Sequence, residues 1–336
     1  MQQKILVIDA FGNKKEAYDR EKVDYISIGE FNCSWKRQLF KLSLIVGAGD
    51  IFFDRAFAKG GINITQYRVI VVNEVHRWGM AFITYIRKKN STCHLLYQLW
   101  NPILLETQSV FKKRGWIKLI DGQKRYNFQM VSFDKGDCEK YGLIYCPQYI
   151  PGGVGSACME GEGYQTDIFF AGKDKGRIST LVHLKKEFER YDLRCKFWVL
   201  PNKRDDYTED EKKILIIKGR KFWKYSIPYV DILVQDRKSK GILDIVQNGQ
   251  FGLTWRPIEA LLLRKKLITN FNNIKQYDFY RKENIFILGE DNMDELPLFI
   301  ESPYQNIDEY IVGSYTFRGM INKTYLDMNW DKERLS

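Results

Sequence analysis

The sequence predicts two tandem α/β domains, each built on a parallel sheet, and three observations support this prediction. The chain has 336 residues, which is long for one domain and suits two. In both halves, short β-branched runs alternate with longer helical patterns, which is typical of parallel sheets. A stretch rich in proline and glycine separates the two halves, as an interdomain linker does.

The first half contains five short apolar runs that we expect to be strands. They are Ile5–Asp9, Tyr25–Ile28, Val69–Asn73, His94–Gln98 and Asn127–Phe133. Between them, residues 35–46 and 80–89 place apolar side chains at helical spacing with basic residues on the other face, which predicts crossover helices. Residues 1–148 are therefore the expected first domain, with 149–165 as the linker.

The same alternation returns after the linker and predicts a second domain over residues 166–302. Residues 303–336 are expected to form a helical segment, with one or two helices in 306–330, that packs back on the first domain. The strands expected in the second domain are Asp167–Ala171, Arg194–Leu200, Val230–Val234, Lys266–Thr269 and Asn284–Ile287, and the helices are Ile178–Tyr191 and Trp255–Leu263.

Composition limits the class of protein. The apolar share of 44% excludes a disordered or collagen-like chain. The 53 Lys and Arg residues against 42 Asp and Glu give a net charge of +11, which favours nucleic acid, phosphorylated small molecules or an anionic membrane surface as partner. The sequence shows no signal peptide, no apolar stretch typical of a transmembrane helix and no CxxC pair. We expect a cytoplasmic protein with reduced thiols.

A basic turn follows the first strand of the second domain. Gly172, Lys173, Lys175 and Arg177 lie between this strand and the helix expected from residue 178. Glycine lets the backbone approach a ligand, the helix start offers amides and a positive dipole end, and the cations add charge. The pattern predicts a diphosphate-binding turn, and a solvated basic turn is the alternative.

The stretch DIVQNGQFGLTWRPIE combines glycines with a helix start. Thr254 is expected to cap the helix, while amides near Gly249 and Gly252 could contact phosphate oxygens. Glu259, about one turn into the helix, could accept both hydroxyls of a ribose. The alternative for Glu259 is an interaction with the helix dipole or an ion pair with Arg256.

The segment QNGQFGLTWRPIEALLLRKKLITNFNNIKQYDFY, followed by NIFIL, resembles the carboxyl-terminal half of bacterial GT-B glycosyltransferases that build capsule, exopolysaccharide or lipopolysaccharide. The stretch FFAGKDKGR opens this half in the expected order, and YQLWNPI in the first half is similar to a strand end of the same group. The resemblance covers most of residues 167–287. It implies two Rossmann-like domains that face each other across a cleft, and transfer of a hexose in surface polysaccharide synthesis.

The resemblance also implies the substrates. The second domain would bind a nucleotide-diphosphate sugar, such as a UDP- or GDP-sugar, and the first domain an oligosaccharide or polyprenyl-diphosphate-linked acceptor. Glu259 would bind the ribose, and Lys175 and Arg177 would neutralise the leaving diphosphate. The nucleobase would lie near residues 198–201 and 225–228. The residues that would line the phosphates or the sugar are Gly249, Gln250, Gly252, Leu253 and Thr254.

The expected reaction requires charge stabilisation, because negative charge develops on the leaving nucleotide diphosphate. Cations and amides can supply it, and no DxD pair follows a strand, so we expect no metal and no other cofactor. A retaining enzyme can use the leaving phosphate as base, whereas an inverting enzyme needs a general base, for which Asp9, Glu74 and His76 are candidates. A helix cap at Asp9 and a structural role for His76 are the alternatives. Trp100 and Asn101 could contact an acceptor sugar, unless Trp100 is a buried strand-end residue.

Basic clusters at residues 36–41, 87–89 and 112–114 favour weak peripheral contact with an anionic membrane at the inner face of the cell membrane, and solvated helix faces explain them nearly as well. A nucleic-acid-binding protein is a different reading of the positive charge. No helix-turn-helix, zinc-finger or RNA-recognition signature occurs, so we expect no nucleic-acid partner. A non-catalytic nucleotide-sugar-binding relative stays open. A Rossmann oxidoreductase is disfavoured, because no GxGxxG follows the first strand.

Overall fold

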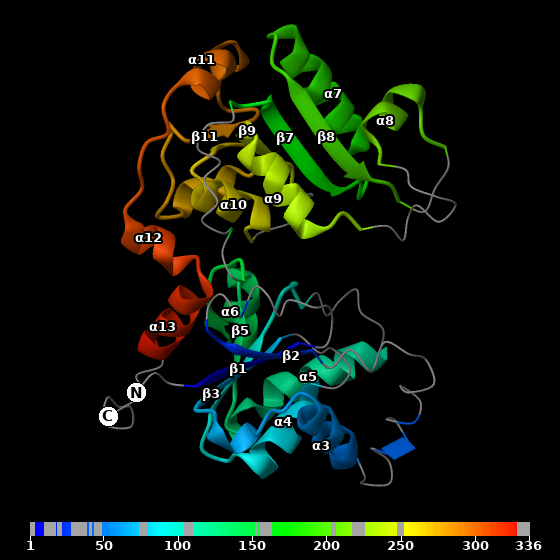
Figure 1. Ribbon diagram of the computed structural model, residues 1–336, viewed down its shortest axis with the longest axis vertical. Coiled ribbons are helices and arrows are strands. Elements are labelled where there is room, and N and C mark those ends of the chain that lie inside the picture. The colour runs from blue at the N-terminus through cyan, green and yellow to red at the C-terminus, as the bar shows by residue number, and fades with distance from the viewer. Residues whose placement is uncertain are drawn as a thin grey trace. The chain divides into compact units, whose positions relative to one another are not determined.

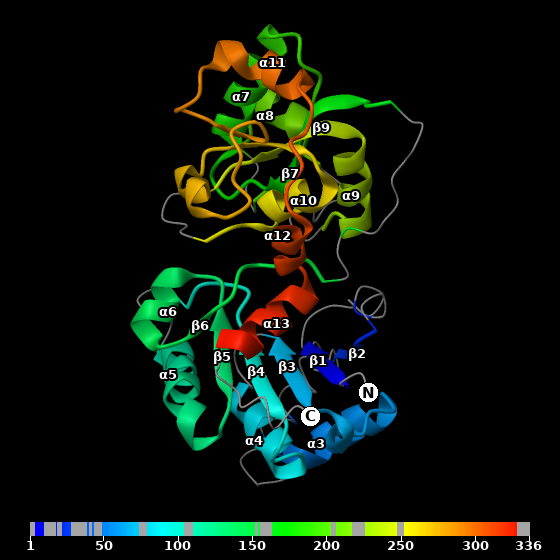
Figure 2. The ribbon, with the colours of Figure 1, turned by 90° about the vertical axis from the view of Figure 1, so that its left-hand side faces the viewer.

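The computed structural model describes residues 4–9, 18, 22–27, 39, 42–43, 49–73, 79–103, 110–151, 154, 163–202, 206–216, 226–246 and 252–327. The chain forms two compact units (Figures 1 and 2). The first unit comprises residues 1–152 together with 316–336, and the second comprises residues 153–315. Each unit has its own sheet and its own core. Residues 316–336, at the end of the chain, belong to the first unit.

The first unit contains a six-stranded parallel sheet in the order β2-β1-β3-β4-β5-β6. Because both faces of the sheet are covered, its strands are continuous apolar runs rather than alternating ones. β1 pairs with β2 on one side and with β3 on the other, so the strand order reverses at β1. The strands are β1 (Ile5–Asp9), β2 (Asp24–Ser27), β3 (Val69–Asn73), β4 (His94–Gln98), β5 (Gln129–Ser132) and β6 (Ile144–Tyr145).

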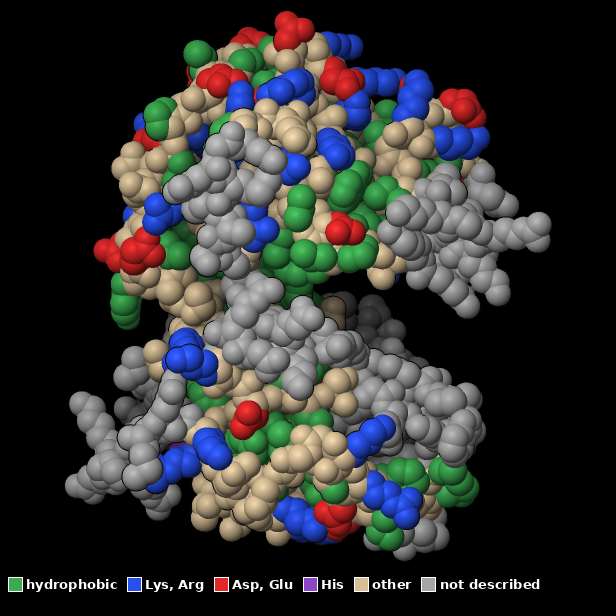
Figure 3. Space-filling view, viewed as in Figure 1, with side chains coloured by type: hydrophobic (Ala, Val, Ile, Leu, Met, Phe, Trp, Pro, Cys, Tyr) green, Lys and Arg blue, Asp and Glu red, His purple; other side chains and the backbone are tan. Residues whose placement is uncertain are grey.

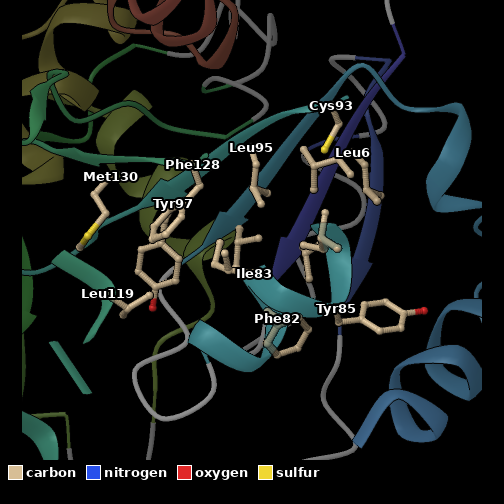
Figure 4. Packing of buried hydrophobic residues seen from close by; sticks show 14 of the residues in the cluster. Leu6, Phe82, Ile83, Tyr85, Cys93, Leu95, Tyr97, Leu119, Phe128 and Met130 are labelled. Carbon is tan, nitrogen blue, oxygen red and sulfur yellow. The ribbon is translucent and has the colours of Figure 1, made fainter. Parts of the chain in front are cut away.

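Helices pack on both faces of this sheet. On one face, α3 (Gly49–Lys59), α4 (Gly79–Lys89) and α5 (Val110–Arg125) pack on the strands, and Figure 4 shows Phe82 and Ile83 of α4 near Leu95 of β4. On the other face, Phe317 of α13 (Phe317–Asp327) packs against Val7. The unit also contains η2 (Ile64–Gln66) and α6 (Lys135–Tyr141).

The second unit contains a five-stranded parallel sheet in the order β11-β10-β9-β7-β8. Its strand order reverses at β7, which lies between β8 and β9. The strands are β7 (Thr166–Lys173), β8 (Cys195–Leu200), β9 (Ser239–Asp244), β10 (Lys266–Thr269) and β11 (Ile285–Ile287). The helices are α7 (Ile178–Arg190), α8 (Glu209–Ile214), α9 (Tyr229–Arg237), α10 (Trp255–Leu263), η5 (Asn272–Gln276), η6 (Met293–Glu295), α11 (Leu296–Glu301) and α12 (Glu309–Ser314).

The predicted fold class, two Rossmann-like parallel-sheet units, is confirmed. The strands Ile5–Asp9, Val69–Asn73, His94–Gln98 and Lys266–Thr269 and the helix Trp255–Leu263 have the predicted bounds. Of the range 306–330, the structure describes residues 306–327, and these contain the helices α12 and α13. Of the expected helix over 35–46, only Leu39, Leu42 and Ser43 belong to the described residues, and all three are helical.

The strand predicted at Val230–Val234 is wrong, because these residues lie in α9. Val230 and Val234 are one helical turn apart, and both are exposed on the outer side of that helix. Pro228 occupies the N-cap position, and the following segment Ser239–Asp244 takes the place in the sheet between β7 and β10. The β-branched residues of α9 misled the prediction, since tertiary packing overrides strand propensity.

None of the helices in the described part of the chain combines the length and the apolar character required to span a bilayer.

Candidate functional site

The topology of the second sheet marks the position of a candidate site. In open α/β sheets, ligands bind outside the carboxyl ends of the strands at the point where the strand order reverses. In the second unit this point lies between β7 and β9. The residues that follow these two strands are those of the basic turn and of the glycine-rich stretch that the sequence singled out.

The turn after β7 has an unusual backbone. Lys175 and Gly176 both adopt left-handed conformations, with φ of 48° and 82°. Glycine does so freely, whereas a lysine is strained there, and such strain persists only where the surroundings enforce it. Asp174 enforces it here, because its Oδ1 accepts hydrogen bonds from the amides of Gly176 and Ile178, both at 3.1 Å.

Asp174 also ties this turn to the end of β8. Its Oδ2 accepts hydrogen bonds from Asn202 Nδ2 at 3.1 Å and from the Tyr207 hydroxyl at 3.0 Å. The side chain is fully buried, so each of these bonds is made away from water. Asp174 was not among the site residues predicted from the sequence. The available signal was an acidic residue directly after an apolar strand and just before a helix start.

Three cations surround the turn. Lys173 and Lys175 are exposed, and Arg177 is half-buried. The side chain of Lys175 is exposed, but its ammonium group is partly desolvated, and this desolvation, followed by the charges of Arg177 and Lys173, lowers the pKa of Lys175. α7 begins directly behind the turn with no acidic residue in its first turn, and Arg177 at its N-cap makes no capping hydrogen bond. The turn thus places three cations at the start of α7, where the buried Asp174 is the carboxylate beside them, and a bound anion would further reduce the repulsion between the cations.

Besides its charge at the turn, Arg177 contacts β7 and the residue that follows β9. Its guanidinium lies over the ring of Phe170, 5.1 Å from the centroid, and Nε donates to the carbonyl of Lys173 at 3.2 Å. Nη1 donates to the carbonyl of Ile245, which follows β9. A Cβ on Gly172 would lie 2.8 Å from Nη2, so this glycine makes room for Arg177, and its predicted contact with a donor stays a prediction.

The stretch after β9 meets the same edge of the sheet. Thr254 caps α10 as predicted: its hydroxyl accepts from the amide of Arg256 at 3.2 Å and donates to Asp244 Oδ1 at 3.1 Å. Gly252 and Leu253 are buried beside it. Gly249 and Gln250 lie outside the described residues. Because Arg177 contacts the residue after Asp244, the two stretches lie side by side.

Glu259 lies in a buried ion-pair network. Arg256 Nη1 contacts Glu259 Oε2 at 2.5 Å and Asp236 Oδ2 at 3.0 Å, and Nη2 contacts Asp236 Oδ1 at 2.6 Å. All three side chains are buried. The ion pair with Arg256, which was the alternative to a ribose-binding role, is therefore present. Ribose binding by Glu259 stays a prediction and would require this carboxylate to exchange partners.

The network contains two carboxylates and one guanidinium. Burial raises the pKa of Glu259 to about 7, against an ordinary value of 4.5, although the charge of Arg256 opposes the shift. Burial also raises the pKa of Asp236, and it raises that of Tyr229, whose ring lies on α9. Desolvation thus favours a protonated carboxyl in the folded chain.

This shift predicts a pH dependence of stability. Between about pH 4.5 and 7 the folded chain holds more protons at Glu259 than the unfolded chain, so this residue lowers the free energy of unfolding as the pH rises. Glu259→Gln removes the titration. Urea unfolding measures the free energy of unfolding of both chains at pH 5 and at pH 7.5. From the lower to the higher pH, the stability of the variant relative to the unaltered chain should increase by about 1 kcal/mol or more. An unchanged difference between the two pH values would contradict the shift.

The carboxyl edge of the first sheet holds the other predicted residues. Asp9 ends β1 and is 5% exposed, and its Oδ2 accepts from Asn73 Nδ2 at 3.5 Å. Trp100 is half-buried with its ring 5.1 Å from that of Tyr149, while Asn101 is exposed. Glu74 and His76, the other candidate bases, lie outside the described residues. A catalytic role for any of these residues stays a prediction.

The candidate nucleobase region is described only in part. Trp198 lies in β8 with its ring edge-on to Phe169, and Lys196 lies over it, 5.1 Å from the ring centroid. Residues 226–228 precede α9, and residue 225 lies outside the described residues. Within the described ranges, no three His, Cys, Asp or Glu side chains come together as a metal site would need.

Comparisons with known proteins add one finding. No family model and no curated protein matches the chain. Among solved structures, the crystal structure of the "Glycotransferase of kitacinnamycin" matches with a TM-score of 0.43 and 7% identity, over 98% of this chain and 99% of that one. At this level of similarity, we assign neither an activity nor a residue from it.

Proposed function

We propose that the chain is a glycosyltransferase that transfers a hexose from a nucleotide-diphosphate sugar. The single observation that supports this most is the turn after β7, where strained backbone, two exposed lysines and the start of α7 meet at the reversal point of a parallel sheet. Such a site suits a diphosphate, because the exposed cations can contact its oxygens, whereas the amides of Gly176 and Ile178 already donate to Asp174. The resemblance of residues 167–287 to GT-B enzymes supplies the class of reaction.

In this proposal the turn stabilises the leaving group. As the bond from the sugar to the diphosphate breaks, negative charge develops on the nucleotide diphosphate, and Lys173 and Lys175 lie where their charge can offset it. Arg177 keeps β7 and β9 together and adds a positive potential. We propose that these cations suffice without a metal ion, and that Glu259 reaches the ribose once its contact with Arg256 opens.

The proposed acceptor is an oligosaccharide or a polyprenyl-diphosphate-linked saccharide of bacterial surface polysaccharide synthesis, at the inner face of the cell membrane. The exposed side chains of α5 support a weak contact with anionic lipid, since Arg114, Lys118 and Lys124 share one side of the helix with the exposed Ile117. On the face in Figure 3, lysine and arginine side chains are spread over both units and interspersed with other residues.

The experiment is a thermal-shift panel of nucleoside diphosphates and their sugars, followed by hydrolysis of any sugar that binds. A ligand at about 100 times its Kd should add about 2.7 kcal/mol of stability. We expect UDP or GDP and the matching sugar to raise Tm, and turnover of that sugar to continue in excess EDTA. No shift with any nucleotide would contradict the function. Turnover that stops with EDTA and returns with Mn²⁺ would contradict only the metal independence.

A further inference from the structure

The two oxygens of the Asp174 carboxylate bind two different segments of the second unit. Oδ1 accepts from amides of the turn after β7, whereas Oδ2 accepts from Asn202 and Tyr207, which follow β8. β7 and β8 are neighbouring parallel strands, and the amide of Asp174 also donates to the carbonyl of Leu200, the last residue of β8, at 2.8 Å. Asp174 thus joins two connections that both leave the carboxyl end of the second sheet.

The hydroxyl of Tyr207 has a defined direction in this contact. It accepts from the backbone amide of Asn202 at 2.7 Å, and an amide N–H only donates, so the hydroxyl proton points to Asp174 Oδ2 at 3.0 Å. Asn202 adds a second bond to the same oxygen through Nδ2. Tyr207 is 6% exposed and Asp174 is fully buried, so surface water does not compete for these bonds. The end of β8 therefore holds the carboxylate in place.

The other oxygen, Oδ1, determines the conformation of Lys175. Its bonds to the amides of Gly176 and Ile178 enclose this lysine, whose φ of 48° is unfavourable for a residue with a Cβ. Glycine would adopt this conformation without strain, yet the residue here is a lysine. Backbone strain of this kind persists only where the surroundings enforce it. Because φ sets the direction in which the side chain leaves the backbone, the place of the ammonium group depends on Asp174.

We propose that Asp174 is a positioning residue for the diphosphate of the donor, which deepens the proposed function and rests on it. Asp174 does not contact the nucleotide, because its side chain is buried and both oxygens accept from donors of this chain. It holds Lys175 so that the ammonium group reaches a phosphate oxygen, and Tyr207 in turn holds Asp174. A change at Tyr207 therefore alters diphosphate binding through Lys175, although Tyr207 contacts neither the lysine nor the ligand.

The test is a double-mutant cycle on nucleotide affinity, measured by isothermal titration of UDP and of GDP into the full chain. Tyr207→Phe keeps the ring and removes the hydroxyl, whereas Lys175→Gln keeps most of the side chain and removes the charge. We expect Tyr207→Phe to weaken binding of the nucleotide about three- to tenfold, the effect of one hydrogen bond. In the Lys175→Gln chain the same substitution should change the affinity by less than about twofold, because the group through which Tyr207 acts is then missing.

Tyr315→Phe is the matched control. Tyr315 is buried, as Tyr207 is, and its hydroxyl donates to Asp278 Oδ1 at 2.7 Å, but Asp278 lies in the connection between β10 and β11. This variant should bind the nucleotide as the unaltered chain does. Asn202→Ala removes the other side-chain donor to Asp174 Oδ2 and should show the same dependence on Lys175 as Tyr207→Phe. Urea unfolding checks that each variant is folded before the titration.

Two results would overturn this inference while leaving the proposed function intact. The first is a nucleotide affinity of Tyr207→Phe equal to that of the unaltered chain. The second is an equal loss of affinity with and without the Lys175→Gln substitution, which would mean that Tyr207 supports the fold and does not act through the lysine. In both cases the unaltered chain still binds UDP or GDP. If it binds neither nucleotide, the proposed function is contradicted, and this inference with it.

Discussion

Arg256→Met is expected to destabilise the chain by about 3–5 kcal/mol, the largest of the expected effects on stability. Arg256 is buried and compensates both Asp236 and Glu259. Its loss removes the cation that contacts both buried carboxylates, leaving only the charges of Lys265 and Arg237 near Asp236, and methionine cannot hydrogen-bond to either carboxylate. Urea unfolding at pH 7.5 measures the change, and a smaller loss at pH 5 should follow, because protonation then relieves the carboxylates.

Two controls separate the charge from the side-chain volume. Arg264→Met removes an arginine whose ion pair with Glu309 is exposed, with 62% and 75% of the two side chains accessible, and should change stability by less than about 1 kcal/mol. Arg256→Met combined with Asp236→Asn and Glu259→Gln should recover much of the loss. If Arg256→Met were as stable as Arg264→Met, this result would contradict the claim that the charge of Arg256 stabilises the two buried carboxylates.

The double substitution Lys173→Gln and Lys175→Gln is expected to weaken binding of UDP or GDP at least tenfold, the largest functional effect. Each lysine is expected to make a charge-assisted hydrogen bond to a phosphate oxygen, and such bonds contribute about 1.5–3 kcal/mol. Both side chains are exposed, so the fold should not change. Isothermal titration at low and at physiological salt measures the affinity, and the salt dependence should decrease in the variant.

The matched control changes two other lysines on the neighbouring helix. Lys185 and Lys186 lie two turns into α7 and pair with Glu189 and Asp210. Lys185→Gln with Lys186→Gln lowers the net charge by the same amount at a distance from the turn, so nucleotide affinity should stay within about twofold. Equal weakening by both double variants would mean that net charge, and not the turn, determines binding.

Much of the fold was predictable, because apolar runs bounded by polar residues define parallel strands. β3, β4, β10 and helix α10 have the predicted bounds. The failure at α9 has a physical cause: its valines lie on the exposed side of a helix, and a local pattern of β-branched residues does not reveal which neighbouring segment enters the sheet.

The candidate site was predictable in part. The basic turn and the cap at Thr254 were visible as residue types beside glycine. The order of the strands in each sheet was not predictable from the sequence. Only this order shows that Lys175 and Asn73 each lie near a reversal point. The burial of Glu259 with Arg256 and Asp236 depends on the packing of α9 on α10, which no short motif contains.

Hydrogen–deuterium exchange of the unaltered chain, with and without saturating UDP and GDP, tests the central claim most directly. If a nucleotide diphosphate occupies the carboxyl end of the second sheet, one of the two nucleotides should slow exchange in residues 173–180 and 252–259, with little change in α7 beyond its first turns. Slower exchange confined to the first unit, or none anywhere, would contradict it.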